Sequence, residues 1–116
     1  MQPTDEFAVD EIGGCTVVAV LADLDIGAVG AFDERVRVAV SAGRPVVIDM
    51  SACSYADSTG LRAIALAYGT FPAGSGIVVP AKGTVRRLFA ITGFDVALSP
   101  FATLDAALKH AATAAS

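Results

Sequence analysis

The segment from Pro45 to Tyr68 constrains the fold of this chain more than any other. It opens with Val46, Val47 and Ile48, and such a run of β-branched residues is typical of a strand buried on both faces. A polar loop follows, and after it apolar residues recur at the spacing of one helix face, at Leu61, Ile64, Ala65 and Tyr68. A buried strand that leads through a loop into an amphipathic helix predicts a sheet with helices packed on it.

The rest of the chain repeats this alternation. A hairpin is expected first, because Gly13 and Gly14 separate two apolar runs. The expected strands cover residues 7–9, 15–21, 46–48, 76–79 and 95–98, and the expected helices begin near residues 29, 57, 85 and 104, the last with Thr103 as a possible cap. This order predicts an α/β fold with a small, mixed but mostly parallel sheet of about five strands and helices packed on it.

The length of 116 residues suits one domain. We expect its core within residues 7–112, after a polar tail at Met1–Asp5 and before a frayed end at residues 112–116.

The net charge of −4 argues against direct nucleic-acid binding, which needs a basic surface. No apolar run is long enough for a membrane span, and no signal-peptide pattern is present. Cys15 and Cys53 are too few for a disulfide framework, so we expect a cytoplasmic protein with reduced, buried thiols.

Ser58 is the residue with the most chemical interest. It stands at the start of the expected second helix, where free backbone N–H groups and the helix dipole favour negative charge. A phosphate on this hydroxyl would therefore be tolerated, although the neighbouring Asp57 adds a repelling negative charge. The same serine could also be only a helix cap, which is the default interpretation of a lone serine after an aspartate, and the order of residues alone does not overturn it.

A search for catalytic residues gives little. His110 is the only histidine and stands near the end of the chain, and Ser58 lies in Asp-Ser-Thr-Gly rather than in the Gly-x-Ser-x-Gly motif of hydrolases. Asp23 and Asp25 could form a carboxylate pair, but two acids in an exposed loop are usually solvated. No Cys, His, Asp or Glu cluster has zinc spacing. We therefore expect no enzyme activity, no metal and no cofactor.

Two further features each have two interpretations. Arg86 and Arg87 could hold an acidic partner, or could simply face water on a helix. Cys53 could be a redox sensor, but the sequence offers no basic neighbour that would lower its pKa, so we interpret it as a packing residue.

Three segments together resemble a known family. Asp49, a short loop, Asp57-Ser58-Thr59-Gly60-Leu61 and the apolar helix resemble the signature of the STAS domain, and more closely that of the anti-sigma factor antagonists. Leu21-Ala22-Asp23-Leu24-Asp25 resembles the family's Leu-x-Gly-Glu-Leu-Asp turn, and residues 85–94 resemble its third helix. The resemblance covers residues 7–112 and implies the STAS fold, with Ser58 at an exposed helix start.

The resemblance also implies a function. An unphosphorylated antagonist binds an anti-sigma factor, which is a serine kinase that uses ATP and Mg²⁺, and thereby releases a sigma factor. The kinase phosphorylates the antagonist, here at Ser58, which breaks the complex, and a phosphatase reverses the step. We expect a monomer or weak homodimer whose partner-binding residues are Asp25, Asp57, Ser58, Thr59, Gly60 and Leu61.

Two points remain open at this stage. The chain has Ala22 and Asp23 where the family commonly has Gly and Glu, so the shape of this loop is uncertain. The alternative function is that of a STAS scaffold or accessory subunit in a stress-signalling or lipid-transport complex, which needs the fold but not the phosphoserine.

Overall fold

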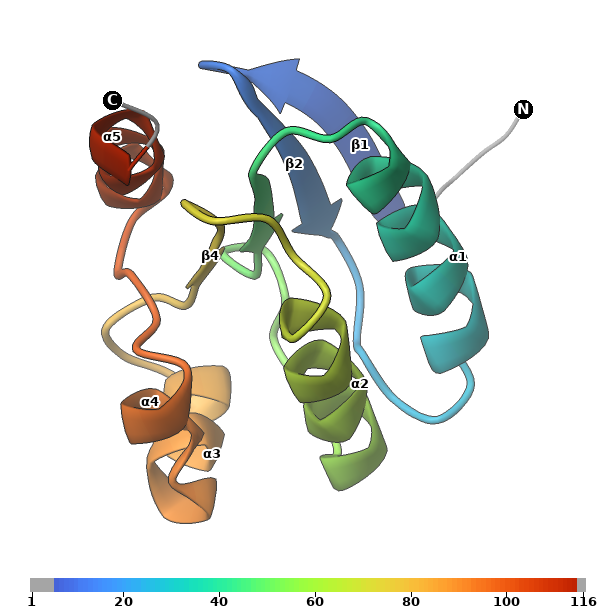
Figure 1. The fold of residues 1–116 in the computed structure, drawn as a ribbon. Helices are drawn as coiled ribbons and strands as arrows, with labels where there is room; N and C mark the ends of the chain where they lie inside the picture. Colours follow the sequence, from blue (N-terminus) through green and yellow to red (C-terminus); the bar gives the residue numbers. More distant parts are fainter. Residues whose placement is uncertain (1–5, 115–116) are drawn as a thin grey trace.

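The computed structural model describes residues 6–114, so the expected N-terminal tail at Met1–Asp5 lies outside the described residues. After an opening hairpin, helices and strands alternate as far as α3, and two further helices follow (Figure 1). In chain order the elements are β1 (Phe7–Ile12), β2 (Cys15–Val20), α1 (Val29–Ser41), β3 (Val46–Asp49), α2 (Ser58–Tyr68), β4 (Gly76–Val78), α3 (Thr84–Thr92), α4 (Phe94–Ala97) and α5 (Leu104–Ala114).

The strands form one four-stranded sheet in the order β1-β2-β3-β4. β1 pairs with β2 in antiparallel fashion, whereas β2, β3 and β4 are parallel. Gly13 and Gly14 connect β1 to β2 with φ values of 59° and 80°, a left-handed pair that suits a two-residue hairpin turn. The mixed, mostly parallel sheet and the α/β fold class are therefore confirmed.

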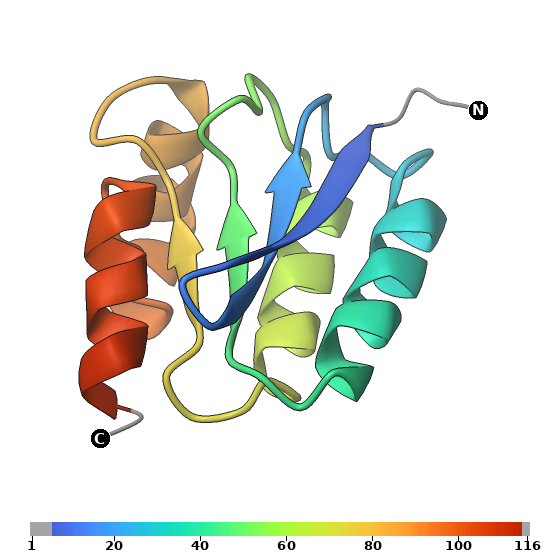
Figure 2. The same cartoon turned by 90° about the horizontal axis from the view of Figure 1, so that it is seen from above.

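Side chains alternate across the sheet and divide the core into layers. Ile48 and Ile77 point to the larger core, which also contains apolar side chains of α1, α2 and α3. Val47 and Val78 point the other way, where Ala107 and Ala111 of α5 cover them. Figure 2 shows α5 in front of the sheet and the α1 and α2 helices behind it. The strand that the sequence singled out, β3, is thus covered on both faces.

The expected last strand at residues 95–98 is wrong. Gly93 ends α3 in the left-handed conformation, at φ 81°, and α4 follows directly. The apolar side chains that pack against the larger core are Phe94 and Leu98, whose spacing of four residues suits a helical turn rather than a strand. Val96 is 80% exposed, which an inner strand position would not allow.

Phe101 takes the place of a fifth strand at the edge of the sheet. Its N–H donates to the carbonyl of Ile77 over 2.8 Å, and its carbonyl accepts from the N–H of Val79 over 2.8 Å. The ring of Phe101 lies over Gly76, where a Cβ atom would stand 2.9 Å from the ring. The C-terminal helix is longer than expected, because α5 continues to Ala114 instead of fraying at Ala112.

Candidate functional site

Two loops meet at the carboxyl ends of β2 and β3. Within residues 21–28, Leu24 donates its N–H to the carbonyl of Tyr55 over 2.9 Å, and its own carbonyl accepts from the N–H of Asp57 over 3.2 Å. The side chain of Leu24 is completely buried below them. The loop after β2 therefore forms a rigid support for the start of α2.

The carboxylate of Asp57 accepts hydrogen bonds both from the first turn of α2 and from the loop after β2. One oxygen, Oδ1, accepts from the N–H of Gly60 over 2.8 Å, which makes Asp57 the N-cap of α2. The other oxygen, Oδ2, accepts from the N–H of Ile26 over 3.1 Å, across 31 residues of sequence. One side chain thus fixes the helix start and the neighbouring loop together.

Ser58 is the first residue of α2, and it is exposed. Its hydroxyl makes no hydrogen bond with any residue in the range 6–114. The interpretation of Ser58 as the helix cap is therefore wrong, because Asp57 has that role. The hydroxyl is left free to react at the positive end of the helix dipole.

Gly60 and Leu61 support the site from below. A Cβ atom on Gly60 would stand 2.1 Å from the carbonyl oxygen of Leu24, so only glycine lets the helix approach the loop this closely. Leu61 is 1% exposed and belongs to the larger core. Both had been expected among the partner-binding residues, but neither offers a side chain to the surface. Thr59 is partly exposed and can do so.

The two acids of the loop after β2 act separately. Asp25 Oδ1 accepts from the N–H of Gly27 over 3.0 Å, which closes a local turn. Asp23 Oδ1 accepts from the hydroxyl of Ser54 over 3.5 Å. Their hydrogen bonds do not join them into a carboxylate pair. Within residues 6–114, no group of three or more His, Cys, Asp or Glu side chains could hold a metal ion.

A groove of about 420 Å³ runs from Ser58 to α3. Sequence reasoning missed this groove, although Thr84, Arg87, Leu88 and Ile91 have the spacing of one helix face. Ile91 is 74% exposed and Tyr55 is 48% exposed, so the groove has a partly apolar rim. We call it the α2–α3 groove; its lining consists of Tyr55, Ala56, Asp57, Ser58, Thr84, Arg87, Leu88 and Ile91.

The two arginines of α3 have different surroundings. Arg86 turns back to the end of β4, where Nε donates to the carbonyl of Pro80 over 3.0 Å and a terminal nitrogen donates to that of Val79 over 2.7 Å. Arg87 is exposed and lines the α2–α3 groove. The expectation that both arginines act alike, on a partner or in water, is therefore wrong for Arg86.

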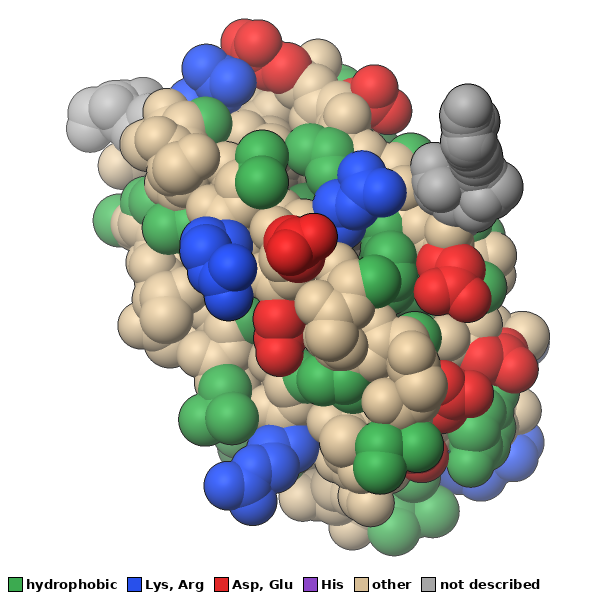
Figure 3. Space-filling model, turned by 90° about the vertical axis from the view of Figure 1, so that its right-hand side faces the viewer, with side chains coloured by type: hydrophobic (Ala, Val, Ile, Leu, Met, Phe, Trp, Pro, Cys, Tyr) green, Lys and Arg blue, Asp and Glu red, His purple; other side chains and the backbone are tan. Residues whose placement is uncertain are grey.

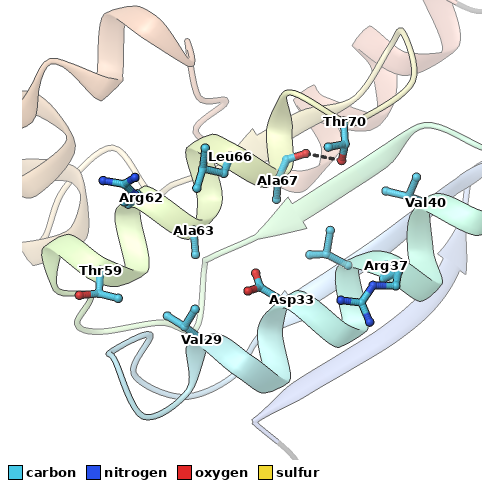
Figure 4. A pocket seen from close by; sticks show the side chains of 11 residues that line it. Val29, Asp33, Arg37, Val40, Thr59, Arg62, Ala63, Leu66, Ala67 and Thr70 are labelled. Carbon is cyan, nitrogen blue, oxygen red and sulfur yellow. Dashed lines mark hydrogen bonds between the residues drawn. The ribbon is translucent and has the colours of Figure 1, made fainter.

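A second groove, of about 560 Å³, separates α1 from α2. Figure 4 shows Val29 and Thr59 at one end of this α1–α2 groove and Val40 and Thr70 at the other. Its floor is apolar, and Leu66 is 64% exposed in it.

Figure 3, which looks onto the α1 side, shows acidic and basic side chains interleaved with small apolar groups. This side of the molecule is therefore not a surface of one charge.

His110 and the cysteines lie outside the site chemistry. His110 is on α5, with its ring centroid 5.1 Å from that of Phe101, and α5 covers the opposite face of the sheet from α2. The histidine therefore cannot act as a base for Ser58. Burial raises the pKa of the Cys53 thiol, and it donates to the carbonyl of Tyr55 over 3.2 Å, as a packing residue would.

In the described part of the chain, none of the helices has the length and apolar character needed to cross a membrane. A comparison with curated proteins found no match.

Solved structures give a clear likeness. An anti-sigma factor antagonist from Mycobacterium paratuberculosis has a TM-score of 0.80 and 31% identity, with 89% of this chain and 90% of that chain covered. SpoIIAA in its unphosphorylated form has a TM-score of 0.60 and 17% identity, with 89% and 94% covered. The Bacillus SpoIIAA in its phosphorylated form has a TM-score of 0.60 and 20% identity, with 89% and 96% covered. The two SpoIIAA structures support the fold alone.

The sequence also matches a known family. Residues 6–107 match the STAS domain, and this range contains both loops of the site and all of β1 to α4. The resemblance noted in three short segments thus extends over most of the chain. The mycobacterial antagonist, at 31% identity over about nine-tenths of both chains, agrees with this match. The chain belongs to the STAS domain family.

Proposed function

We propose that this protein is an anti-sigma factor antagonist that is switched by phosphorylation of Ser58. In the unphosphorylated form it binds an anti-sigma factor, which is a serine kinase, and the sigma factor is released. The observation that carries this proposal is the free hydroxyl of Ser58, which is exposed at the start of α2 while Asp57 caps the helix. The likeness to an anti-sigma factor antagonist from Mycobacterium paratuberculosis supports it.

The proposed chemistry is a phosphoryl transfer. The kinase holds ATP and Mg²⁺, and Ser58 Oγ attacks the γ-phosphorus. A new P–O bond forms, the bond to ADP breaks, and the hydroxyl proton leaves to a base on the kinase. Ser58 suits this step because its oxygen has no hydrogen bond to lose and is open to solvent.

Phosphorylation changes the charge of the surface without breaking the fold. The phosphate adds a charge of about −1.5 to −2 at neutral pH. The dipole of α2 tolerates an anion at its start, so the helix remains. The partner meets this charge next to the carboxylate of Asp57, and a surface that fitted the neutral serine no longer binds. A phosphatase removes the phosphate and restores binding.

The proposed partner surface surrounds Ser58. Asp25, Asp57 and Thr59 belong to it, and Ile26 adds an apolar contact because its side chain is 75% exposed. Gly60 and Leu61 hold these residues in place from below. We expect the protein to act in the cytoplasm as a monomer or weak homodimer.

The test measures binding of the cognate kinase to four forms of the protein. Wild type and Ser58→Ala should bind with similar affinity, and Ser58→Ala should take up no phosphate from Mg-ATP. Protein with authentic phosphoserine at position 58 should bind at least ten times more weakly. Ser58→Asp should lie between them, because it carries one negative charge and fewer acceptor oxygens than a phosphate.

His110→Ala is the matched control, since His110 lies on the opposite face of the sheet, and it should bind as wild type does. Equal affinity of the phosphorylated and unphosphorylated forms would refute the switch. The protein would then be better explained as a STAS scaffold or accessory subunit in a stress-signalling or lipid-transport complex.

A further inference from the structure

Arg87 is the cationic side chain among the residues that line the α2–α3 groove with Ser58. Both residues line the α2–α3 groove, which has room for a phosphate at about 420 Å³. Arg87 reaches this groove because it stands one turn after Thr84, on the face of α3 that also presents Leu88 and Ile91. The groove thus joins the candidate acceptor to a guanidinium of the same chain.

The guanidinium of Arg87 makes no ion pair and no hydrogen bond with other side chains or carbonyls in the range 6–114. The ion pairs found within residues 6–114 join Arg44 to Glu11 and Lys109 to Asp105. No hydrogen bond of the Arg87 side chain is found in that range, whereas its neighbour Arg86 is held by the carbonyls of Val79 and Pro80. Arg86 fixes the start of α3, and Arg87 is left free for an anion.

We propose that Arg87 binds the phosphate on Ser58 within the same molecule. The N–H groups of the guanidinium donate to phosphate oxygens, a pairing for which the planar group of arginine is well suited. The phosphate is thereby drawn over the α2–α3 groove, and the groove is closed in the phosphorylated form. Arg87 is a positioning residue for the modified serine, and this inference rests on the proposed function because it requires a phosphate at Ser58.

This pairing explains how one site can hold so much negative charge. The carboxylate of Asp57 stays at the helix start, where it binds the N–H groups of Gly60 and Ile26. A phosphate beside it is repelled, and the repulsion raises the second pKa of the phosphate. The guanidinium of Arg87 acts against this, since an opposite charge nearby favours the ionised form. The phosphate then remains a dianion near neutral pH.

The test uses protein in which phosphoserine is incorporated at position 58 during translation, so that no kinase is needed. The second pKa of the phosphate, ordinarily about 6, is measured by ³¹P NMR titration at low salt. We expect Arg87→Gln to raise this pKa by about half a unit or more, and Arg87→Lys to raise it less. The Arg87 Nε–H signal should shift on phosphorylation, whereas that of Arg86 should not.

Two other arginines complete the experiment. Arg37→Gln is the matched control for loss of one positive charge, because Arg37 lies on α1 in the other groove, and it should leave the phosphate pKa unchanged. Arg62 is the competing candidate, since it stands four residues after Ser58 on α2. A pKa that responds to Arg62→Gln and not to Arg87→Gln would overturn the proposal, as would a pKa that responds to neither.

These results are separable from the proposed function. Loss of the switch would appear as equal kinase affinity for the two forms of the wild-type protein. Loss of the Arg87 pairing would appear in the ³¹P titration, whatever the kinase does.

Discussion

Gly60 lies so close to Leu24 that a Cβ atom on the glycine would stand 2.1 Å from the carbonyl oxygen of Leu24. The contact joins the first turn of α2 to the loop after β2, and the atom in the way belongs to the backbone. Neither element can move without disturbing its hydrogen bonds to the other.

Gly60→Ala should therefore destabilise the protein by about 1–3 kcal/mol, because the added methyl group forces the helix away from the loop. Gly30→Ala is the matched control in α1, where a Cβ atom would meet nothing within 4 Å; it should be neutral or stabilising by up to about 1 kcal/mol. Urea unfolding of both variants measures the difference. Equal stability of the two variants would contradict the close approach.

Asp57→Ala should cost about 1–2 kcal/mol, because it removes the cap of α2 together with the bond to Ile26. Ser58→Ala, one residue away, should change stability by less than about 0.5 kcal/mol, since its hydroxyl has no partner within residues 6–114. Thermal and urea unfolding compare the pair. A larger loss for Ser58→Ala than for Asp57→Ala would mean that the serine, not the aspartate, caps the helix.

Leu61→Ala should destabilise by about 2–5 kcal/mol, because the side chain is 1% exposed in the larger core. Leu66 is on the same helix and 64% exposed, so Leu66→Ala should cost less than about 1 kcal/mol. Both free energies of unfolding come from the same denaturant titration. If Leu61→Ala cost less than half a kcal/mol, the buried face of α2 would be assigned wrongly.

Substitution of the two neighbouring arginines of α3 should also change the stability of the protein by different amounts. Arg86→Ala should cost about 1.5–3 kcal/mol, since it leaves the carbonyls of Val79 and Pro80 without a charged donor. Arg87→Ala should be nearly neutral in the unphosphorylated protein. Differential scanning calorimetry of the two variants is sufficient, and a similar loss of stability in both would show that Arg87 also has a structural role.

The buried thiols should make the protein less stable in alkali. Burial raises the pKa of both Cys15 and Cys53 above that of the unfolded chain. Above the ordinary thiol pKa of about 8.5, the unfolded chain releases protons that the folded protein keeps, so stability falls as pH rises. Between pH 7.5 and 9.5 the wild type should lose more unfolding free energy than the Cys15→Ala/Cys53→Ala variant. Parallel losses would contradict this expectation.

Hydrophobic periodicity was sufficient to predict most of the fold. Leu61 and Ile64 are buried as their spacing indicates, and Thr103 caps α5 by accepting from the N–H of Ala106 over 3.2 Å. The error at residues 95–98 arose because four apolar-rich residues carry too short a pattern to separate a strand from a helical turn. The spacing of Phe94 and Leu98 was the signal that was overlooked.

The site was predicted less completely, because its geometry depends on distant pairs. The sequence places Asp57 and Ser58 side by side, but which of them caps the helix is fixed by tertiary structure, in which Asp57 also binds Ile26. Leu61 was expected on the partner surface although its spacing already indicated the packed face of the helix, and the fold buries its side chain. The α2–α3 groove joins residues about 30 positions apart, beyond the reach of local patterns.

The position of the C-terminal end of α5 has a practical consequence for binding measurements. Gly74, in the turn before β4, has the Cβ atom of Ala114 and the ring of Pro45 close by, so α5 ends at the amino ends of the parallel strands. Ser58 begins α2 at their carboxyl ends, on the far side of the sheet (Figure 2). A sensor chip or bead attached after α5 would thus present Ser58 to the solution. The start of β1 lies at the same end of the sheet as the site, because the carbonyl of Glu6 accepts from the N–H of Leu21, the first residue of the loop after β2.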